Sequence, residues 1–201
     1  MRWLPYGPEA ALIECDSLSQ MSAVRAAVTG LPDLIEVVPG ARSVLVVARQ
    51  GTKALGDARR VVESADLSNP PAAEPREIVL EVRYDGEDLA LVAETAGIST
   101  AEVIELHTGA EYTVAFTGFA PGFAYLTGLP DALQQSRLDS PRTKVPAGSV
   151  GVAGEFTGVY PRSSPGGWRL LGHTDAVLFD PRAQRPALLA PGDRVRFRSL
   201  G

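Results

Sequence analysis

In the first 65 residues, segments with the apolar pattern of a strand take turns with segments that have the apolar spacing of a helix. A short apolar run at 11–15 predicts a strand, and apolar residues then recur at helical spacing over 18–28. Two β-branched runs, 34–38 and 44–47, flank a Pro-Gly turn and predict a hairpin. A second amphipathic helix follows, with its apolar positions over 55–62 on one face. The order strand, helix, hairpin, helix predicts a small α/β sandwich.

Residues 66–77 break this regular pattern. They contain three prolines and few apolar residues, which is typical of a linker. We therefore expect two domains: an N-terminal α+β domain over 1–75 and a second domain over 76–201.

The second domain begins with a strand and two helices and then changes character. Residues 78–84 alternate like a strand, and two helices are predicted over 88–96 and 99–107. Ser99 and Glu102 have the spacing of a capping box at the start of the second helix. Beyond residue 111 the apolar runs are short and are separated by glycine and proline. This pattern predicts an all-β barrel or sandwich.

Composition narrows the possible functions. The net charge of -5 and the pI near 5.1 argue against nucleic-acid binding. Cys15 is the single cysteine and there are two histidines, so neither an intrachain disulfide nor a thiolate or imidazole metal site is expected. No apolar run approaches the ~20 residues of a membrane span, and a proline interrupts the start where a signal peptide is apolar. We expect a cytoplasmic protein.

One segment concentrates features of a ligand site. Ten of the twenty glycines lie between Gly118 and Gly172. Such loops either turn tightly at barrel corners or bring backbone N–H groups close to a ligand. The same segment has five basic residues against three acidic ones, a local balance of +2, which favours a small anionic substrate. The basic residues are Arg137, Arg142, Lys144, Arg162 and Arg169. Scattered surface arginines remain the alternative interpretation.

Several motifs in this segment are specific enough to indicate a family. They are Gly-Phe-Ala-Pro-Gly-Phe-Ala-Tyr-Leu at 118–126, Pro-Arg at 141–142, Val-Pro-Ala-Gly-Ser-Val-Gly at 145–151, Thr-Gly-Val-Tyr-Pro at 157–161, Ser-Pro-Gly-Gly-Trp at 164–168, Gly-His-Thr at 172–174, Leu-Phe-Asp-Pro at 178–181 and Pro-Gly-Asp-Arg-Val at 191–195. In this order they resemble the family of the 5-oxoprolinase B subunits, also known as allophanate hydrolase subunit 1. The loop 84–88 is shorter than in this family, and Glu155-Phe156 stands where a Gln usually precedes Thr157.

The resemblance implies a fold and an activity. The fold is α+β, with a small N-terminal domain followed by a cyclophilin-like β-barrel. The activity is ATP-dependent amide hydrolysis that converts 5-oxoproline to glutamate, with the 5-oxoprolinase C subunit, or allophanate hydrolase subunit 2, as the partner. ATP enters as its Mg complex. Because the chain lacks a Gly-x-x-x-x-Gly-Lys-Ser/Thr loop, any nucleotide site is unconventional, shared with the partner or on the partner.

Two other activities remain open within the same family. One is hydrolysis of the ureide allophanate without ATP. The other is a regulatory role, because relatives of this architecture inhibit a histidine kinase by binding its dimerisation domain. An exposed apolar patch without a ligand pocket would favour a regulator. Prolyl isomerisation is suggested by the barrel fold alone, which is weak support.

Candidate site residues follow from the chemistry that amide opening needs. The candidates for catalysis are His173, His107 and Glu155, and those for substrate binding are Arg142, Lys144, Tyr125, Tyr160 and Arg162. Each has a structural alternative. His107 lies at a predicted helix C-terminus, where it can simply favour the helix dipole. His173 can be a hydrogen-bonded structural residue, Arg142 and Lys144 can be a solvent-facing pair, and the tyrosines can pack under a loop.

Overall fold

The computed structural model describes residues 1–67 and 75–200, which fall into two compact units, Met1–Ala73 and Glu74–Gly201. Most of the predicted linker over 66–77 lies outside the described residues, so the boundary at residue 75 stays a prediction. Each unit is described by itself. No helix among the described residues has both the length and the apolar character needed to cross a membrane.

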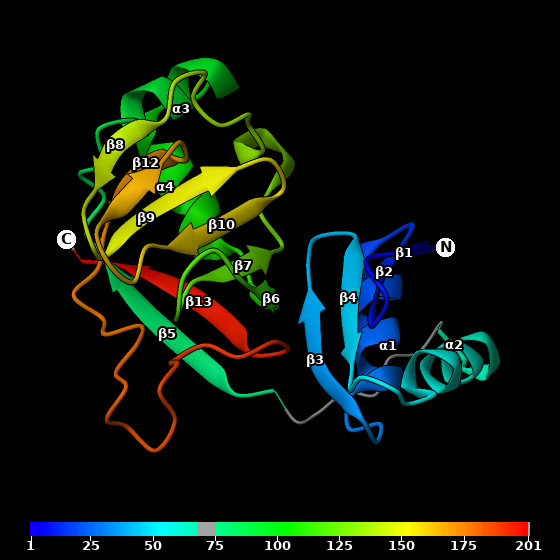
Figure 1. The fold of residues 1–201 in the computed structure, drawn as a ribbon. Coiled ribbons are helices and arrows are strands. Elements are labelled where there is room, and N and C mark those ends of the chain that lie inside the picture. The colour runs from blue at the N-terminus through cyan, green and yellow to red at the C-terminus, as the bar shows by residue number, and fades with distance from the viewer. Residues whose placement is uncertain (68–74, 201) are drawn as a thin grey trace. The chain divides into compact units, whose positions relative to one another are not determined.

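The first unit is a four-stranded antiparallel sheet with two helices (Figure 1). The elements are β1 (Arg2–Pro5), β2 (Ala10–Glu14), α1 (Leu18–Val28), β3 (Leu34–Pro39), β4 (Ser43–Ala48) and α2 (Ala54–Ser64), and the strand order is β1-β2-β4-β3. The predicted strand, hairpin and helices are confirmed. Strand β1 was not predicted, because four residues around a single Trp-Leu pair carry no alternating pattern.

The core of the first unit lies between its sheet and its helices. Alternate residues of β4, Val44 and Val46, are fully buried, as is Val24 of α1. Both α1 and α2 contact β4 and each other, so the helices cover one face of the sheet. Helix α1 begins where the Ser17 hydroxyl accepts a hydrogen bond of 3.1 Å from the Gln20 N–H.

The second unit is a strongly curved sheet that forms a nearly closed barrel. Its strands are β5 (Glu77–Val82), β6 (Tyr112–Thr117), β7 (Ala124–Thr127), β9 (Ser149–Ala153), β10 (Phe156–Val159), β12 (Arg169–His173) and β13 (Arg194–Ser199), in the order β12-β9-β10-β7-β6-β13-β5. Strands β8 (Arg142–Val145) and β11 (Ser164–Gly166) form a separate ribbon, and a short 3-10 helix spans Asp131–Leu133. The predicted α+β fold with a C-terminal barrel is confirmed.

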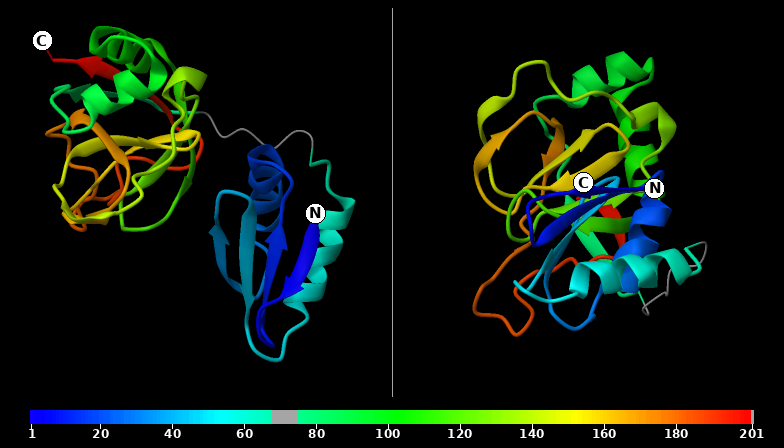
Figure 2. Two further views of the ribbon diagram at one scale, coloured as in Figure 1. Left: turned by 90° about the horizontal axis from the view of Figure 1, so that it is seen from above. Right: turned by 45° about the vertical axis from the view of Figure 1, so that its right-hand side comes forward.

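Two helices pack against this barrel, α3 (Leu89–Ala96) and α4 (Thr100–Gly109), drawn in green in Figures 1 and 2. Helix α3 contacts β12 and α4 contacts β13. Gly97 ends α3 with a left-handed φ of 70°. The predicted capping box is present, because the Ser99 hydroxyl accepts from the Glu102 N–H and the Glu102 carboxylate accepts from the Ser99 N–H.

The two edge strands of the barrel, β5 and β12, meet at one point. Arg83 and His173 exchange two backbone hydrogen bonds, of 2.8 and 2.9 Å. This approach requires glycine on both sides of the seam. A side chain at Gly172 would overlap the Arg83 carbonyl, and one at Gly86 would overlap the backbone at Leu170. The seam is therefore a place where the backbone itself fills the available space.

This close approach gives a first prediction. Gly172→Ala is expected to destabilise the second unit by at least about 2 kcal/mol, because a methyl group there must displace the opposite strand. Gly109→Ala is the matched control: nothing lies near its side-chain position, so it should stabilise α4 by up to about 1 kcal/mol. Urea unfolding curves of the two variants and the wild type measure both effects. Equal midpoints for Gly172→Ala and the wild type would contradict closure at this seam.

Candidate functional site

Aromatic side chains gather on β6, β7 and β10 and on the loops next to these strands. The cluster comprises Phe116, Phe119, Phe123, Tyr125, Phe156, Tyr160 and Trp168, with ring centroids 4.3 to 6.5 Å apart and most pairs edge to face. Edge-to-face pairs contribute about 0.5–1.5 kcal/mol each beyond the area that they bury. We refer to these residues as the aromatic cluster. They form a rigid wall on this side of the barrel.

A cavity of about 150 Å³ opens among these rings. It is lined by Phe119, Phe123, Tyr125, Arg137, Tyr160, Gly166, Gly167 and Trp168. Sites for drug-sized molecules are usually about 300–1,000 Å³, so this aromatic cavity suits a much smaller ligand. Gly166 lies directly against Tyr160, because a side chain at this position would overlap the Tyr160 hydroxyl.

The lining residues carry four polar side-chain groups: two phenols, one guanidinium and the indole N–H of Trp168. Burial raises the pKa of Tyr125 and of Tyr160, so both side chains are neutral phenols that can donate a hydrogen bond. Arg137 is the charged residue of the lining. The arrangement can hold a small planar amide with its carbonyl on the phenols.

Phe119 occupies a backbone conformation that bulky residues rarely adopt. Its φ is 65°, in the left-handed region, which costs on the order of 1–3 kcal/mol for a non-glycine residue. The side chain is 58% exposed, yet its ring contacts Phe123 and Tyr160 edge to face, at 5.3 and 6.2 Å between centroids. The strained residue therefore forms the outer wall of the aromatic cavity.

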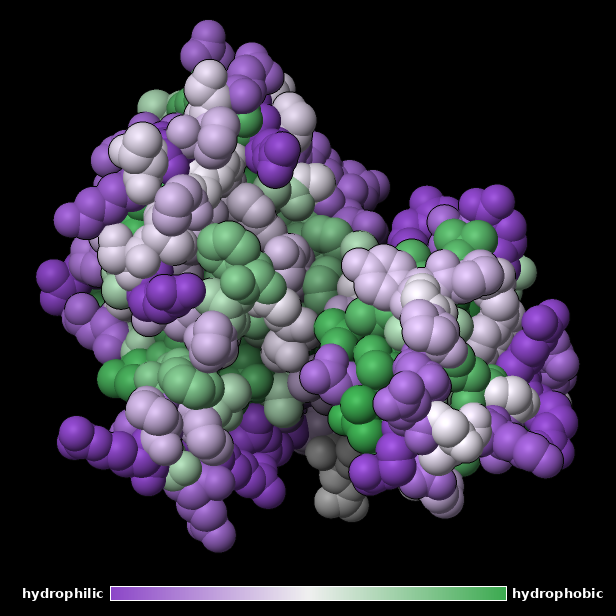
Figure 3. All heavy atoms as spheres, in the orientation of Figure 1, coloured by the Kyte–Doolittle hydropathy of each residue, from purple (hydrophilic) through white to green (hydrophobic). Residues whose placement is uncertain are grey.

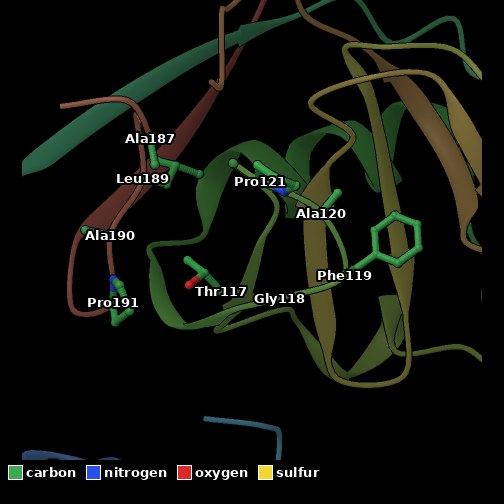
Figure 4. Close-up of a pocket in the computed structure, with 10 residues that line it drawn as sticks. Thr117, Gly118, Phe119, Ala120, Pro121, Ala187, Leu189, Ala190 and Pro191 are labelled. Atoms are coloured by element: carbon green, nitrogen blue, oxygen red, sulfur yellow. The ribbon is translucent and has the colours of Figure 1, made fainter. Parts of the chain in front are cut away.

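A second hollow, of about 530 Å³, lies on the other side of the same loop (Figure 4). It lies between Thr117–Gly122 and the segment from Ala187 to Pro191. In Figure 4 the Leu189 and Pro121 side chains face each other across it, while the Phe119 ring points away. Its lining has no charged side chain. On the face drawn in Figure 3, apolar side chains occupy the middle of the second unit and hydrophilic ones surround them.

His107, a predicted general base, lies inside the barrel and is 0% exposed. The Thr157 hydroxyl donates to the Gly151 carbonyl over 3.1 Å, so it must accept from His107 Nε2–H over 3.0 Å. His107 Nδ1 then accepts from the Tyr84 hydroxyl over 2.7 Å. Burial lowers the pKa of His107 to about 3. The imidazole is therefore a neutral structural group, and it lines neither hollow.

His173, the other predicted catalytic histidine, lies at the barrel seam. Its Nδ1 is 2.8 Å from the Asp85 carboxylate, and the side chain is 39% exposed. Its backbone makes the two bonds to Arg83 described above. Glu155, the third catalytic candidate, is exposed in the turn between β9 and β10. Neither His173 nor Glu155 lines the aromatic cavity, and their catalytic roles stay predictions.

The predicted anion binders differ in how far their charge is already neutralised. Arg142 is 2.7 Å from the buried carboxylate of Asp88 and 3.2 Å from Glu87. Lys144 and Arg162 have no ion pair among the described residues, but they do not line the aromatic cavity. Of the five predicted substrate-binding residues, the cavity brings together Tyr125 and Tyr160.

Sequence reasoning missed Arg137, Phe119 and Trp168 as lining residues. Arg137 entered only a local charge count, and no spacing rule singles out one arginine among several. Trp168 was visible as the end of the Ser-Pro-Gly-Gly-Trp motif, whose two glycines also line the cavity. The sequence signal for these lining residues was this motif, in which two glycines that permit close backbone approach stand next to an aromatic residue.

The buried neutral imidazole predicts how stability depends on pH. The pKa of a histidine is near 6.5 in an unfolded chain, whereas that of His107 is about 3 in the folded one. Between these values the unfolded state binds one more proton, so the unfolding free energy falls as pH falls, by up to about 1.4 kcal/mol per pH unit. His107→Gln should lose this component of the slope between about pH 6 and pH 4.

His173→Gln serves as the control, because His173 is the other of the two histidines in the sequence and is partly exposed. Urea unfolding at several pH values compares the two variants with the wild type. If the unfolding free energy of His107→Gln changed with pH as steeply as that of the wild type, the buried, neutral state of His107 would be contradicted.

Comparisons with known proteins agree with this architecture. Residues 1–189 match the family described as the carboxyltransferase domain, subdomain C and D. The B subunit of the 5-oxoprolinase of Escherichia coli O157:H7 is 45% identical over 174 residues, which cover 83% of this chain and 78% of that protein. The urea amidolyase of Saccharomyces cerevisiae is 30% identical over 118 residues, 53% of this chain and 6% of that protein.

Among solved structures, that of TTHA0988 superposes with a TM-score of 0.83 at 34% identity. The match covers 96% of this chain but 40% of the TTHA0988 chain, so this chain spans less than half of that longer protein. The urea amidolyase of Kluyveromyces lactis shares the fold, with a TM-score of 0.78 at 18% identity. With the sequence match over residues 1–189, these likenesses establish that the chain belongs to the carboxyltransferase domain family, subdomains C and D, together with the 5-oxoprolinase B subunits.

Proposed function

We propose that this chain is the B subunit of a two-subunit, ATP-dependent 5-oxoprolinase that opens 5-oxoproline to glutamate together with a C subunit. The observation that carries the proposal is the aromatic cavity, which combines neutral phenols, one guanidinium and a volume suited to a small cyclic amide. The name of the E. coli relative supports the same reaction and implies a partner subunit.

The role of this chain in the reaction is to bind the lactam and polarise its carbonyl. Nitrogen donates electron density into an amide carbonyl, which makes it a poor electrophile. A phenol that donates to the carbonyl oxygen stabilises the negative charge that develops there. Tyr125 and Tyr160 line the cavity and supply two protonated phenols, whose pKa burial raises further. The surrounding rings lower the local polarity, which strengthens these hydrogen bonds.

Neither the aromatic cavity nor the larger hollow fits ATP. A nucleotide is drug-sized, and the aromatic cavity has about half the smallest volume usual for such ligands. The larger hollow has the volume but no cation for phosphates. No group of three or more His, Cys, Asp or Glu that could hold a metal ion occurs within the described ranges. We therefore propose that ATP and its Mg are bound mainly by the partner subunit.

Allophanate is the second candidate substrate. It is a small planar ureide with one negative charge, so the same groups fit it, and the similarity to yeast urea amidolyase favours it. Allophanate hydrolysis needs no ATP, which separates the two reactions experimentally.

The decisive experiment is to co-express this chain with the C subunit from the same genome and to measure glutamate release from 5-oxoproline. We expect release only with both chains and ATP. Each chain alone is the control. Ammonia release from allophanate without ATP would instead assign the ureide reaction, and a stable complex inactive on both substrates would contradict the enzyme proposal and favour the regulatory role.

The active complex also tests the phenols. Tyr125→Phe keeps the ring that stacks on Phe116, 4.3 Å away, and removes only the hydroxyl. We expect kcat/KM for 5-oxoproline to fall roughly a hundredfold, as when a single oxyanion donor is lost. Tyr6→Phe, at an exposed residue of the first unit, is the matched control. An unchanged kcat/KM in Tyr125→Phe would remove this hydroxyl from the reaction.

A further inference from the structure

Five basic residues lie within the glycine-rich segment, and two of them are already engaged. Arg142 pairs with Asp88 and Glu87. Arg169 donates to the Gln135 amide oxygen over 2.6 Å and to the Thr95 hydroxyl over 2.8 Å. In the part of the chain that the structure describes, the side chains of Arg137, Lys144 and Arg162 have neither a hydrogen bond nor an ion pair. Of these three, Arg137 alone lines the aromatic cavity.

The backbone around Arg137 is held in place although the residue lies in a loop. Before it, the Gln135 carbonyl accepts from the Gly154 N–H over 2.7 Å, and the Ser136 carbonyl accepts from the Arg169 guanidinium over 3.1 Å. After it, the Leu138 N–H donates to the Gly167 carbonyl over 2.7 Å. Gly167 is itself a lining residue. Arg137 is therefore an exposed residue on a fixed backbone that lines the aromatic cavity, and its guanidinium donors have no partner among the described residues.

No carboxylate lines the aromatic cavity, so an anion that enters it meets a single positive charge. A guanidinium presents two parallel N–H donors to a carboxylate, and such charge-assisted bonds are about twice as strong as neutral ones. Ring side chains, among them Trp168 and Phe123, make up most of the lining, which favours a flat ligand.

We infer that the aromatic cavity is a binding site for small planar amides that carry one carboxylate, and that Arg137 selects them by binding this carboxylate. The inference rests on the proposed function for the choice of substrate, and it adds the residue that determines charge specificity. The amide carbonyl faces Tyr125 and Tyr160, so the two ends of the ligand are recognised by different groups. 5-Oxoproline and allophanate share this chemistry.

Binding is measured on the full-length chain by the fluorescence of Trp168, which lines the cavity. Trp3→Phe provides a background in which Trp168 is the single tryptophan. The probes are 5-oxoproline, allophanate and 2-pyrrolidinone, the neutral lactam without a carboxylate. We expect saturable quenching by the two anions and binding of 2-pyrrolidinone that is about tenfold weaker or more. The anion with the lower Kd is the one of the two substrates that the site prefers.

Arg137→Met tests the role of the guanidinium directly. It is expected to raise the Kd for 5-oxoproline about tenfold or more and to leave that for 2-pyrrolidinone unchanged. Arg137→Lys keeps the charge but loses the planar fork, so its Kd should lie between those of Arg137→Met and the wild type. Arg185→Met, a change of the same charge at an exposed position outside the cavity, is the matched control and should change neither Kd.

Three results would overturn the inference: no saturable quenching by either anion, equal weakening of charged and neutral ligands in Arg137→Met, or no weakening of either. These results are distinct from failure of the proposed reaction. If 5-oxoproline binds through Arg137 but the complex of both chains releases no glutamate, the binding site stands and the 5-oxoprolinase proposal fails. If the complex is active and Arg137→Met leaves KM unchanged, only the inference fails.

Discussion

The second unit depends on the closure of its barrel at a single seam. Arg83 and His173 join the two edge strands through backbone bonds, and the glycines at 86 and 172 allow the strands to come this close. Asp88 extends the seam: its buried carboxylate accepts from the Leu170 N–H over 2.7 Å. Because β12 is fixed in this way, Trp168, which directly precedes it, is held against the other rings of the aromatic cluster. The cavity is thus a consequence of the seam.

The seam is also tied to the interior by a buried polar chain. Tyr84, next to the seam residue Arg83, donates to His107 on α4, and His107 donates to Thr157 on β10. Every buried polar side-chain atom of these three residues has a partner, which is the condition under which such a network stabilises a core. His107 therefore links the seam, helix α4 and strand β10. A catalytic base must exchange protons with its substrate, whereas this imidazole is shielded from solvent on all sides.

The features that the sequence predicted correctly are those with local causes. The capping box at Ser99 spans four residues, and the hairpin of the first unit spans fifteen, so their signals lie within one window. The parallel pairing of β5 with β13 joins residues 117 positions apart and leaves no local pattern. Which cation has a carboxylate partner also depends on contacts between distant segments. Arg142 was favoured over Arg137, but the carboxylates that neutralise it lie more than fifty residues away. Which charge is free for a ligand is a property of the fold, not of the segment.

The conformation of Phe119 shows that the fold maintains this site at a cost. Glycine would adopt the same φ without strain, as Gly122 does three residues later at 84°. A phenylalanine there costs on the order of 1–3 kcal/mol, and more than half of its side chain remains exposed, so burial offsets little of that cost. What the ring does provide is edge-to-face contact with Phe123 and Tyr160 on the outer side of the cavity. Strained residues of this kind cluster at ligand sites, so the strain at Phe119, which yields little stability but completes the wall of the aromatic cavity, supports the proposed binding site.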